Sequence, residues 1–134
     1  MDRDERIRLG SVTGYNATLG ARVVSYGDGE ARLEMEVVPS VQNVAGSLHG
    51  GAIATLVDRA GTVAIVTADR DGRPGVTTDL NVSYFAPAPA GSTVVAEARV
   101  LKAGKTLAYV TVDIRRVTDG VLVAQGRMTK FQGG

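Results

Sequence analysis

The sequence predicts an α+β fold in which an antiparallel sheet of about six strands wraps around one central, buried helix. The first observation is that residues 50–67 are apolar on nearly every side of a helical wheel, which is the pattern of a buried helix. The second is that six further segments carry strand patterns, two before this helix and four after it. The third is that only one such helix is available, so a curved sheet is the arrangement that can cover it.

Length and composition favour a single domain over residues 1–134, with residues 1–15 as an N-terminal arm. We expect the first ten residues to form a short, frayed helix whose charges are solvated. The 15 basic and 14 acidic residues are spread along the chain, which argues against a nucleic-acid partner. The absence of cysteine and the single histidine argue against a disulfide or a metal site. The charged N-terminus is unlike a secretory signal, and the central helix, with Asp58 and Arg59 inside it, is a poor membrane span. We therefore expect a cytoplasmic protein.

Before the helix, residues 18–38 show the pattern of a hairpin whose turn is Gly27-Asp28-Gly29. In the second arm, apolar residues alternate with charged ones, as in a strand with one buried face. The apolar set is Leu33, Met35 and Val37, and the charged set is Arg32, Glu34 and Glu36. Pro39 ends this strand.

The helix itself starts at His49-Gly50-Gly51 and contains one narrow polar stripe. The stripe consists of Thr55, Asp58, Arg59 and Thr62. Residues 69–75 form a polar loop in which glycine and proline stop the helix.

Four strands are expected after that loop, at residues 76–86, 93–101, 107–117 and 121–131. In the third of them, Val110, Val112 and Ile114 should face the core. Because one helix covers only one face of the sheet, we expect the other face and the edges to pair with further subunits.

Asp58 is the first candidate for chemistry, because an ionised carboxylate in an apolar setting is costly unless it is paired or used. Two interpretations stay open at this point. Asp58 pairs with Arg59 or with an arginine of another strand, or it faces a cavity or a subunit boundary and acts there.

The start of the helix is the second candidate. The first backbone N–H groups of a helix lack partners inside it, so those of Gly50 and Gly51 could hold an oxyanion. Alternatively, the two glycines only make the turn into the helix. His49 is then a cap or a catalyst, and Asn43 donates its amide to the same carbonyl or is an ordinary turn residue.

Two further segments carry polar groups. Residues 77–81 place Thr77 in a strand that is otherwise a core candidate, where it could orient a water or be present for its β-propensity. Residues 102–106 place two lysines around Gly104, either as a phosphate contact or as a solvated turn.

Three motifs together closely resemble the hotdog-fold acyl-CoA thioesterases, and among them the phenylacetate-pathway (PaaI) and thioesterase superfamily member 2 type. They are Asn43-x5-His49-Gly50-Gly51 followed by Asp58, then GVTTDLNVSY at 75–84, and LKAGKT at 101–106. The similarity covers about residues 35–131.

The resemblance implies hydrolysis of an aryl-acyl or a medium- or long-chain fatty acyl-CoA to the free acid and coenzyme A. It implies that the N–H of Gly50, helped by Asn43, polarises the thioester carbonyl, while His49 orders this end of the site. Asp58 of the opposite subunit would act as general base or nucleophile. Thr77 would orient the water.

The resemblance also implies contacts to coenzyme A from Tyr84, Phe85, Ala86, Pro87, Lys102, Gly104, Lys105 and Thr106. It implies a homotetramer built as a dimer of dimers, with active sites at the dimer interface and no metal or cofactor. Two alternatives remain: a non-hydrolytic acyl-CoA binding protein, and an acyl-thioester dehydratase of the same fold.

Overall fold

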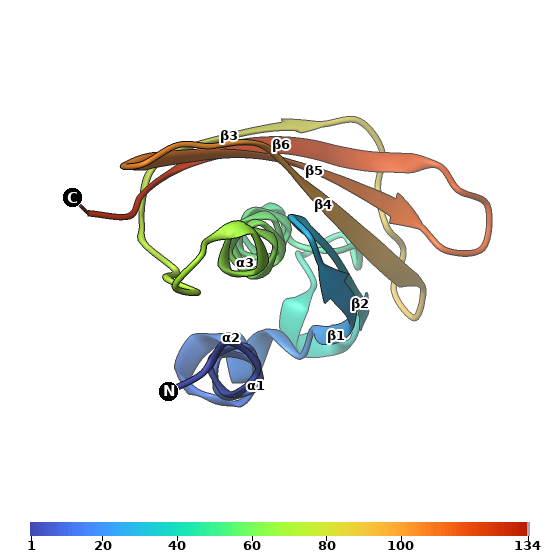
Figure 1. The fold of residues 1–134 in the computed structure, drawn as a ribbon. Helices are drawn as coiled ribbons and strands as arrows, with labels where there is room; N and C mark the ends of the chain where they lie inside the picture. The colour runs from blue at the N-terminus through green and yellow to red at the C-terminus, as the bar shows by residue number, and fades with distance from the viewer. Residues whose placement is uncertain (134) are drawn as a thin grey trace.

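The computed structural model describes residues 1–133 and confirms the predicted α+β architecture (Figure 1). Its elements are α1 (Arg3–Val12), α2 (Gly14–Leu19), β1 (Arg22–Gly27), β2 (Glu30–Glu36), a short 3-10 turn (Pro39–Val41), α3 (Gly50–Ala68), β3 (Val76–Tyr84), β4 (Thr93–Ala103), β5 (Leu107–Arg116) and β6 (Leu122–Phe131). The strands form one antiparallel sheet in the order β1-β2-β4-β5-β6-β3. The sheet curves around α3, and α1 and α2 lie on the side of α3 that faces away from it.

Helix α3 is the centre of the core, as its all-round apolar sequence predicts. By length and composition it would pass for a membrane-spanning helix, but most of it is buried within this fold. The helix lies very close to β6. A Cβ added to Gly61 would lie 2.5 Å from Sδ of Met128, and one added to Gly126 would lie 2.5 Å from Cγ1 of Val57. Glycine at these two positions therefore allows the helix and the sheet to approach each other.

The predicted alternation in the strands is confirmed. Leu33, Met35 and Val37 are buried on the inner face of β2 and just after it. Val110, Val112 and Ile114 are buried on the inner face of β5.

Strand β3 lies at the edge of the sheet, whereas its sequence was interpreted as that of a core strand. Within the described part of the chain it pairs only with β6 and ends the sheet. Most of its side chains are exposed, including Val76, Leu80 and Tyr84. The sequence could not distinguish these positions from a core strand, because its apolar residues alternate in the same way whether or not a neighbour covers them. One edge of β3 is thus left open along its length.

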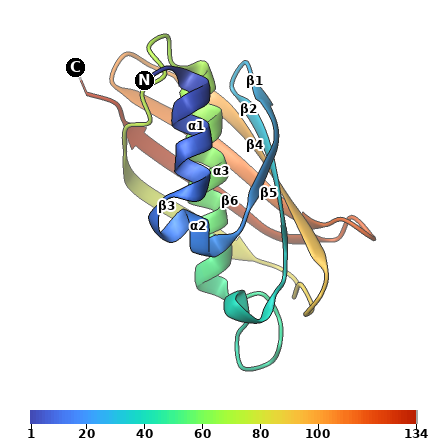
Figure 2. The same cartoon turned by 90° about the horizontal axis from the view of Figure 1, so that it is seen from below.

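The N-terminal arm is helical as expected, but it is not a frayed end. Helix α1 runs alongside α3 (Figure 2) and buries Ile7 against it. Arg59, which is only 7% exposed, donates from its guanidinium to the carbonyl oxygen of Ile7 and to Oγ of Ser11, each at 2.8 Å. Burial lowers the pKa of the Arg59 guanidinium, while the charge of Asp58 acts in the opposite direction. A buried arginine of α3 therefore attaches α1 to the core.

The loop after α3 is held by one carboxylate. Asp69, whose side chain is 7% exposed, accepts from the guanidinium of Arg73 at 3.0 and 3.1 Å and from the backbone N–H groups of Asp71 and Arg73. The Arg73 guanidinium and these N–H groups lower the pKa of the Asp69 carboxyl, because they stabilise its charged form.

We expect Asp69→Asn to lower the free energy of unfolding by about 1–3 kcal/mol at pH 7, because charge-assisted hydrogen bonds are lost. A carboxyl whose pKa is lowered by folding contributes stability above its unfolded pKa, near 3.9, and loses that contribution as the pH falls through its folded pKa. Denaturant unfolding at pH 7 and at pH 2–3 should show a difference between wild type and variant that shrinks in acid. Asp71→Asn, at an exposed carboxylate two residues away, is the control. An equal difference at both pH values would contradict the assignment.

Candidate active site

The start of α3 carries a backbone donor that no group among residues 1–133 uses. His49 caps the helix: its Nδ1 accepts from the N–H of Gly51 at 2.8 Å, and its own N–H donates to the carbonyl of Val41. The N–H of Gly50 has no acceptor among residues 1–133. Of the two glycines, Gly50 is therefore the one whose N–H can polarise a ligand oxygen, as the resemblance implies.

Asn43 lies in the loop before this helix and is exposed. Its Oδ1 accepts from the N–H groups of Ala45 and Ser47 at 3.0 and 3.1 Å. These two bonds fix which side of the amide is the oxygen, so its Nδ2 remains to donate elsewhere. Asn43 is thus both a turn residue and an available donor, and the two interpretations left open by the sequence are compatible.

Asp58 is half-buried on α3 and accepts a hydrogen bond at Oδ1 from the hydroxyl of Thr77, at 2.8 Å. The structural alternative, pairing with Arg59, is wrong, because the Arg59 guanidinium donates to α1 instead. No arginine or lysine forms an ion pair with Asp58 within residues 1–133. The carboxylate is therefore held by a neutral donor.

The residues of the predicted polar stripe have separate hydrogen-bond partners. The hydroxyl of Thr55 donates to the backbone carbonyl of Gly51, and that of Thr62 donates to the backbone carbonyl of Asp58, each four residues earlier. Both hydroxyls therefore form their hydrogen bonds within the helix. They do not flank the Asp58 carboxylate by hydrogen bonds.

A bulge in β3 decides which threonine meets Asp58. The register with β6 shifts between Thr77 and Asp79, which leaves Thr78 as the extra residue. Without the bulge, strict alternation would place Thr78 on the inner face with Leu80, and Thr77 on the outer face.

The predicted residues form two groups that lie apart in one chain. We call Asn43, His49 and Gly50 the carbonyl group, and Asp58 with Thr77 the carboxylate group. Asp58 follows Gly50 by eight residues of helix, or about 12 Å along its axis. Attack on a bound carbonyl needs both parts within about 3 Å of the reacting atoms. One chain alone therefore does not bring the two groups to one substrate.

The segments predicted to bind coenzyme A are also divided between these groups. Tyr84 donates from its hydroxyl to the carbonyl of Gly50 at 2.9 Å, so residues 84–87 lie beside the carbonyl group. Ala103 is level with Thr77 across the sheet, through Ala108 and Lys130. Tyr84 follows Thr77 by seven positions in β3, so the two segments lie about 23 Å apart along the strand direction. Lys102 is the last but one residue of β4 rather than part of the turn.

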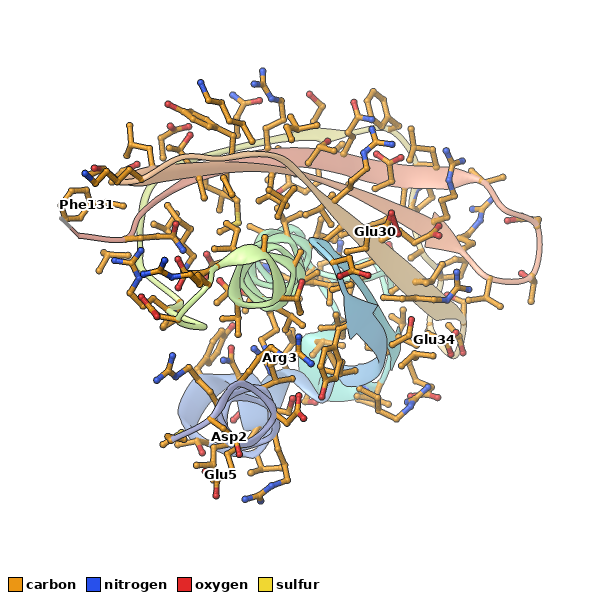
Figure 3. The ribbon with its side chains drawn as sticks, in the orientation of Figure 1. Asp2, Arg3, Glu5, Glu30, Glu34 and Phe131 are labelled. Carbon is orange, nitrogen blue, oxygen red and sulfur yellow. The ribbon has the colours of Figure 1, made fainter. Side chains whose placement is uncertain are left out.

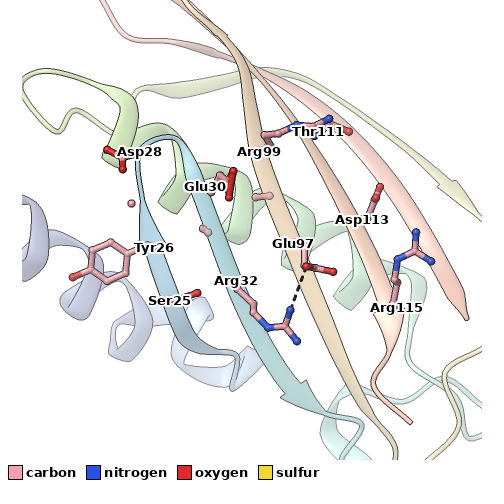
Figure 4. A pocket seen from close by; sticks show the side chains of 13 residues that line it. Ser25, Tyr26, Asp28, Glu30, Arg32, Glu97, Arg99, Thr111, Asp113 and Arg115 are labelled. Carbon is pink, nitrogen blue, oxygen red and sulfur yellow. Dashed lines mark hydrogen bonds and ion pairs between the residues drawn. The ribbon is translucent and has the colours of Figure 1, made fainter. Parts of the chain in front are cut away.

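Two hollows lie in different parts of the molecule, one beside the start of α3 and one on the outer face of the sheet. One of about 250 Å³ lies between α2 and the start of α3, lined in part by Tyr15, His49 and Gly51. A wider hollow of about 730 Å³ lies on the outer face of the sheet (Figure 4) and contains none of the predicted site residues. Its lining is charged, with an ion pair between Arg32 and Glu97 at 3.2 Å. The smaller hollow is thus the one that opens beside the carbonyl group.

Sequence reasoning missed Lys130 of β6. This lysine is only 6% exposed, and its strand position pairs with Thr77. A signal was available, because Lys130 follows Met128 and Gly126 at the period of two that marks the buried face of β6. Among residues 1–133, no cluster of three or more histidine and acidic side chains could hold a metal ion.

Several known proteins are similar to this chain over most of its length. The family model described as the thioesterase superfamily matches residues 45–123, more than half of the chain. Human acyl-coenzyme A thioesterase 13 is 46% identical over 111 residues, which cover 83% of this chain and 79% of the relative. The crystal structure of zebrafish thioesterase superfamily member 2 superposes with a TM-score of 0.90 at 38% identity, covering 99% of both chains.

A Streptococcus mutans protein bound to acetyl-CoA superposes with a TM-score of 0.78 at 27% identity, covering 85% of this chain and 89% of that one. The predicted fold and family are both confirmed by these similarities. The chain therefore belongs to the thioesterase superfamily and is a thioester hydrolase.

Proposed function

We propose that the chain hydrolyses acyl-CoA thioesters at a site composed of the carbonyl group of one protomer and the carboxylate group of its partner. The observation that carries the proposal is the separation of these groups within one chain, although each presents an available catalytic function. Among residues 1–133, Gly50 has an N–H without an acceptor and Asp58 a carboxylate without an ion-pair partner, about 12 Å apart along α3.

Each group has a defined part in the reaction. The N–H of Gly50 and Nδ2 of Asn43 donate to the thioester oxygen as it gains negative charge, which other oxyanion sites suggest is worth about 3 kcal/mol. Asp58 removes a proton from the attacking water, a step worth about 10²–10⁴-fold. The tetrahedral intermediate then collapses and the C–S bond breaks. The departing thiolate takes the proton that Asp58 removed from water, so the free acid and the thiol of coenzyme A leave and Asp58 is ionised again. Thr77 holds the Asp58 carboxylate in position, and His49 holds the turn that presents Gly50.

The open edge of β3 supports this composite site. A twofold axis that pairs β3 with its copy in antiparallel fashion brings the Thr77 end of one strand to the Tyr84 end of the other. Such a pairing also covers the exposed Val76 and Leu80. It would place the carboxylate group of each chain beside the carbonyl group of its partner.

The same pairing unites the coenzyme A segments. Residues 84–87 accompany the carbonyl group and residues 102–106 the carboxylate group, so both reach one composite site. Lys102 and Lys105 are exposed there and are suited to the phosphates of coenzyme A. The acetyl-CoA bound to the Streptococcus mutans protein supports this class of substrate.

Further assembly into a dimer of dimers would use the outer face of the sheet. Side chains there stand away from α3 (Figure 3), and many are charged. We propose a tetramer, no metal or other cofactor in the reaction, and a cytoplasmic location where acyl-CoA is available.

The test is thiol release from a panel of acetyl-, octanoyl-, palmitoyl- and phenylacetyl-CoA. We expect free coenzyme A to appear in equal amount with the free acid, and the preferred acyl group to show as the highest kcat/KM. Binding of every acyl-CoA without release would instead identify an acyl-CoA binding protein. Formation of an enoyl product from a 3-hydroxyacyl-CoA would identify a dehydratase.

A further inference from the structure

Tyr84 is the last residue of β3, and its side chain reaches the start of α3. Its hydroxyl donates to the backbone carbonyl of Gly50 at 2.9 Å. Its ring lies against the same residue, since a Cβ added to Gly50 would be 3.6 Å from Cε1 of Tyr84. Strand β3 therefore contacts helix α3 at the residue that carries the available N–H.

The backbone at this point needs support from outside. Gly50 and Gly51 lack a Cβ, so their own side chains place little restriction on the dihedral angles of the turn into the helix. A donor that stabilises a developing oxyanion must keep its direction within about 10–20°, and neighbouring groups supply that restriction by packing and hydrogen bonds. The direction of the Gly50 N–H therefore depends on what holds the peptide groups on either side of Gly50.

The two peptide groups that flank Gly50 are held at three of their four polar ends. The carbonyl of His49 accepts from the N–H of Ile53 at 3.0 Å, and the N–H of Gly51 donates to Nδ1 of His49 at 2.8 Å. The carbonyl of Gly50 accepts from the hydroxyl of Tyr84. The bonds from His49 and Ile53 fix the turn within the helix and its cap, and the bond from Tyr84 fixes it relative to the sheet.

Strand β3 thus holds both groups of the site. Thr77, near its start, donates to Asp58 of the carboxylate group, and Tyr84, at its end, donates to Gly50 of the carbonyl group. In the composite site proposed above, the carbonyl group of one protomer faces the carboxylate group of its partner. Each is then attached to a β3 strand, and the paired strands set the distance between them.

We propose that Tyr84 is a positioning residue for hydrolysis, whose hydroxyl fixes the direction in which the N–H of Gly50 points at the thioester oxygen. The inference rests on the proposed function, because it assumes that the Gly50 N–H receives the oxyanion. Negative charge on that oxygen is greatest in the transition state, so loosening the donor lowers kcat more than it raises KM. The ring of Tyr84 is left to the contact with coenzyme A that the resemblance implies.

The experiment compares kcat and KM for thiol release in wild type, Tyr84→Phe and the matched control Tyr26→Phe. Phenylalanine keeps the ring and removes the hydroxyl, at a side chain that is 54% exposed, so the fold is retained. The control also loses one tyrosine hydrogen bond, because Tyr26 donates to Asp4 at 2.8 Å, away from the site.

In Tyr84→Phe we expect kcat to fall about three- to tenfold, the factor that one ordinary hydrogen bond represents. KM should change less than about twofold, because the lost interaction acts in the transition state. Tyr26→Phe should keep the wild-type kcat and KM. A rise in KM with an unchanged kcat in Tyr84→Phe would overturn the proposal and assign the hydroxyl to coenzyme A. An equal loss of kcat in Tyr26→Phe would also overturn it.

An infrared measurement reports on the donor itself. The acyl-CoA with the highest kcat/KM, labelled with ¹³C at the thioester carbonyl, is bound to Asp58→Asn, in which hydrolysis is slow. Adding Tyr84→Phe should move the labelled carbonyl band to higher frequency, because the Gly50 N–H then polarises the oxygen less. Adding Tyr26→Phe should leave the band in place. A band that does not move in Tyr84→Phe would contradict the proposal, since a role in stability alone leaves the bound carbonyl unchanged.

Backbone ¹⁵N relaxation of the ligand-free protein separates this proposal from the proposed function. The order parameter of the Gly50 amide should fall in Tyr84→Phe and not in Tyr26→Phe. If wild type does not hydrolyse acyl-CoA but this order parameter falls, the function fails and the hold of Tyr84 on Gly50 stands. Hydrolysis by wild type with an unchanged kcat in Tyr84→Phe would remove only the role of Tyr84.

Discussion

Replacing Asp58 by asparagine is expected to reduce kcat for acyl-CoA hydrolysis by about 10²–10⁴-fold, because the amide cannot take a proton from water. Asparagine has the same shape and keeps an oxygen that can accept the hydroxyl of Thr77, which donates to Asp58 at 2.8 Å. KM should therefore remain close to the wild-type value. The measurement is thiol release under saturating acyl-CoA, with thermal unfolding and size-exclusion chromatography to show that fold and assembly are retained.

The control is Asp113→Asn on β5, where the carboxylate faces the outer side of the sheet and accepts from Gln125. It removes one negative charge without touching the site, and its kcat should equal that of wild type. A properly folded Asp58→Asn enzyme with near-normal kcat would remove Asp58 from the mechanism.

Most of the fold could be predicted because its signals are local. The apolar run of α3, the alternation of Leu33 and Met35, and the hairpin turn at Gly27–Gly29 each depend on neighbours in the chain. The position of β3 at the edge of the sheet does not depend on neighbours in the chain. Strand order is set by long-range pairing, which the pattern of a single strand does not encode. The bulge at Thr78 is likewise invisible in the sequence, although it decides that Thr77 faces Asp58.

The site was predictable in its parts but not in its geometry. The sequence indicates an oxyanion donor at Gly50 and a carboxylate at Asp58, and from the residues alone it left Arg59 as a partner for that carboxylate. Helical spacing places residues 58 and 59 on neighbouring faces, so only the packing of α1 shows that Arg59 turns away from Asp58. Lys130 was overlooked because a lysine in a strand is normally solvated.

The division of the site between two chains has a consequence for mixtures of inactive variants. Asn43→Asp keeps the oxygen that accepts from Ala45 and Ser47 but removes the amide donors and adds negative charge where the oxyanion forms. We expect this variant to lose about 10²–10³-fold in kcat, as other oxyanion-site variants do. Each site of an Asp58→Asn homodimer lacks the base, and each site of an Asn43→Asp homodimer lacks the donor.

When the two variants are refolded together in equal amounts, we expect activity to return to about one quarter of the wild-type value per chain. Half of the dimers are then mixed, and each mixed dimer has one site with Asn43 from one chain and Asp58 from the other, while its second site lacks both. Mixed dimers isolated with two affinity tags should reach about one half of wild-type kcat. Refolding Asp58→Asn with the double variant Asn43→Asp/Asp58→Asn is the control, because no combination of these chains contains the base. If each site lay within one chain, every mixture would stay at the level of its inactive parents, since no chain in it carries both groups.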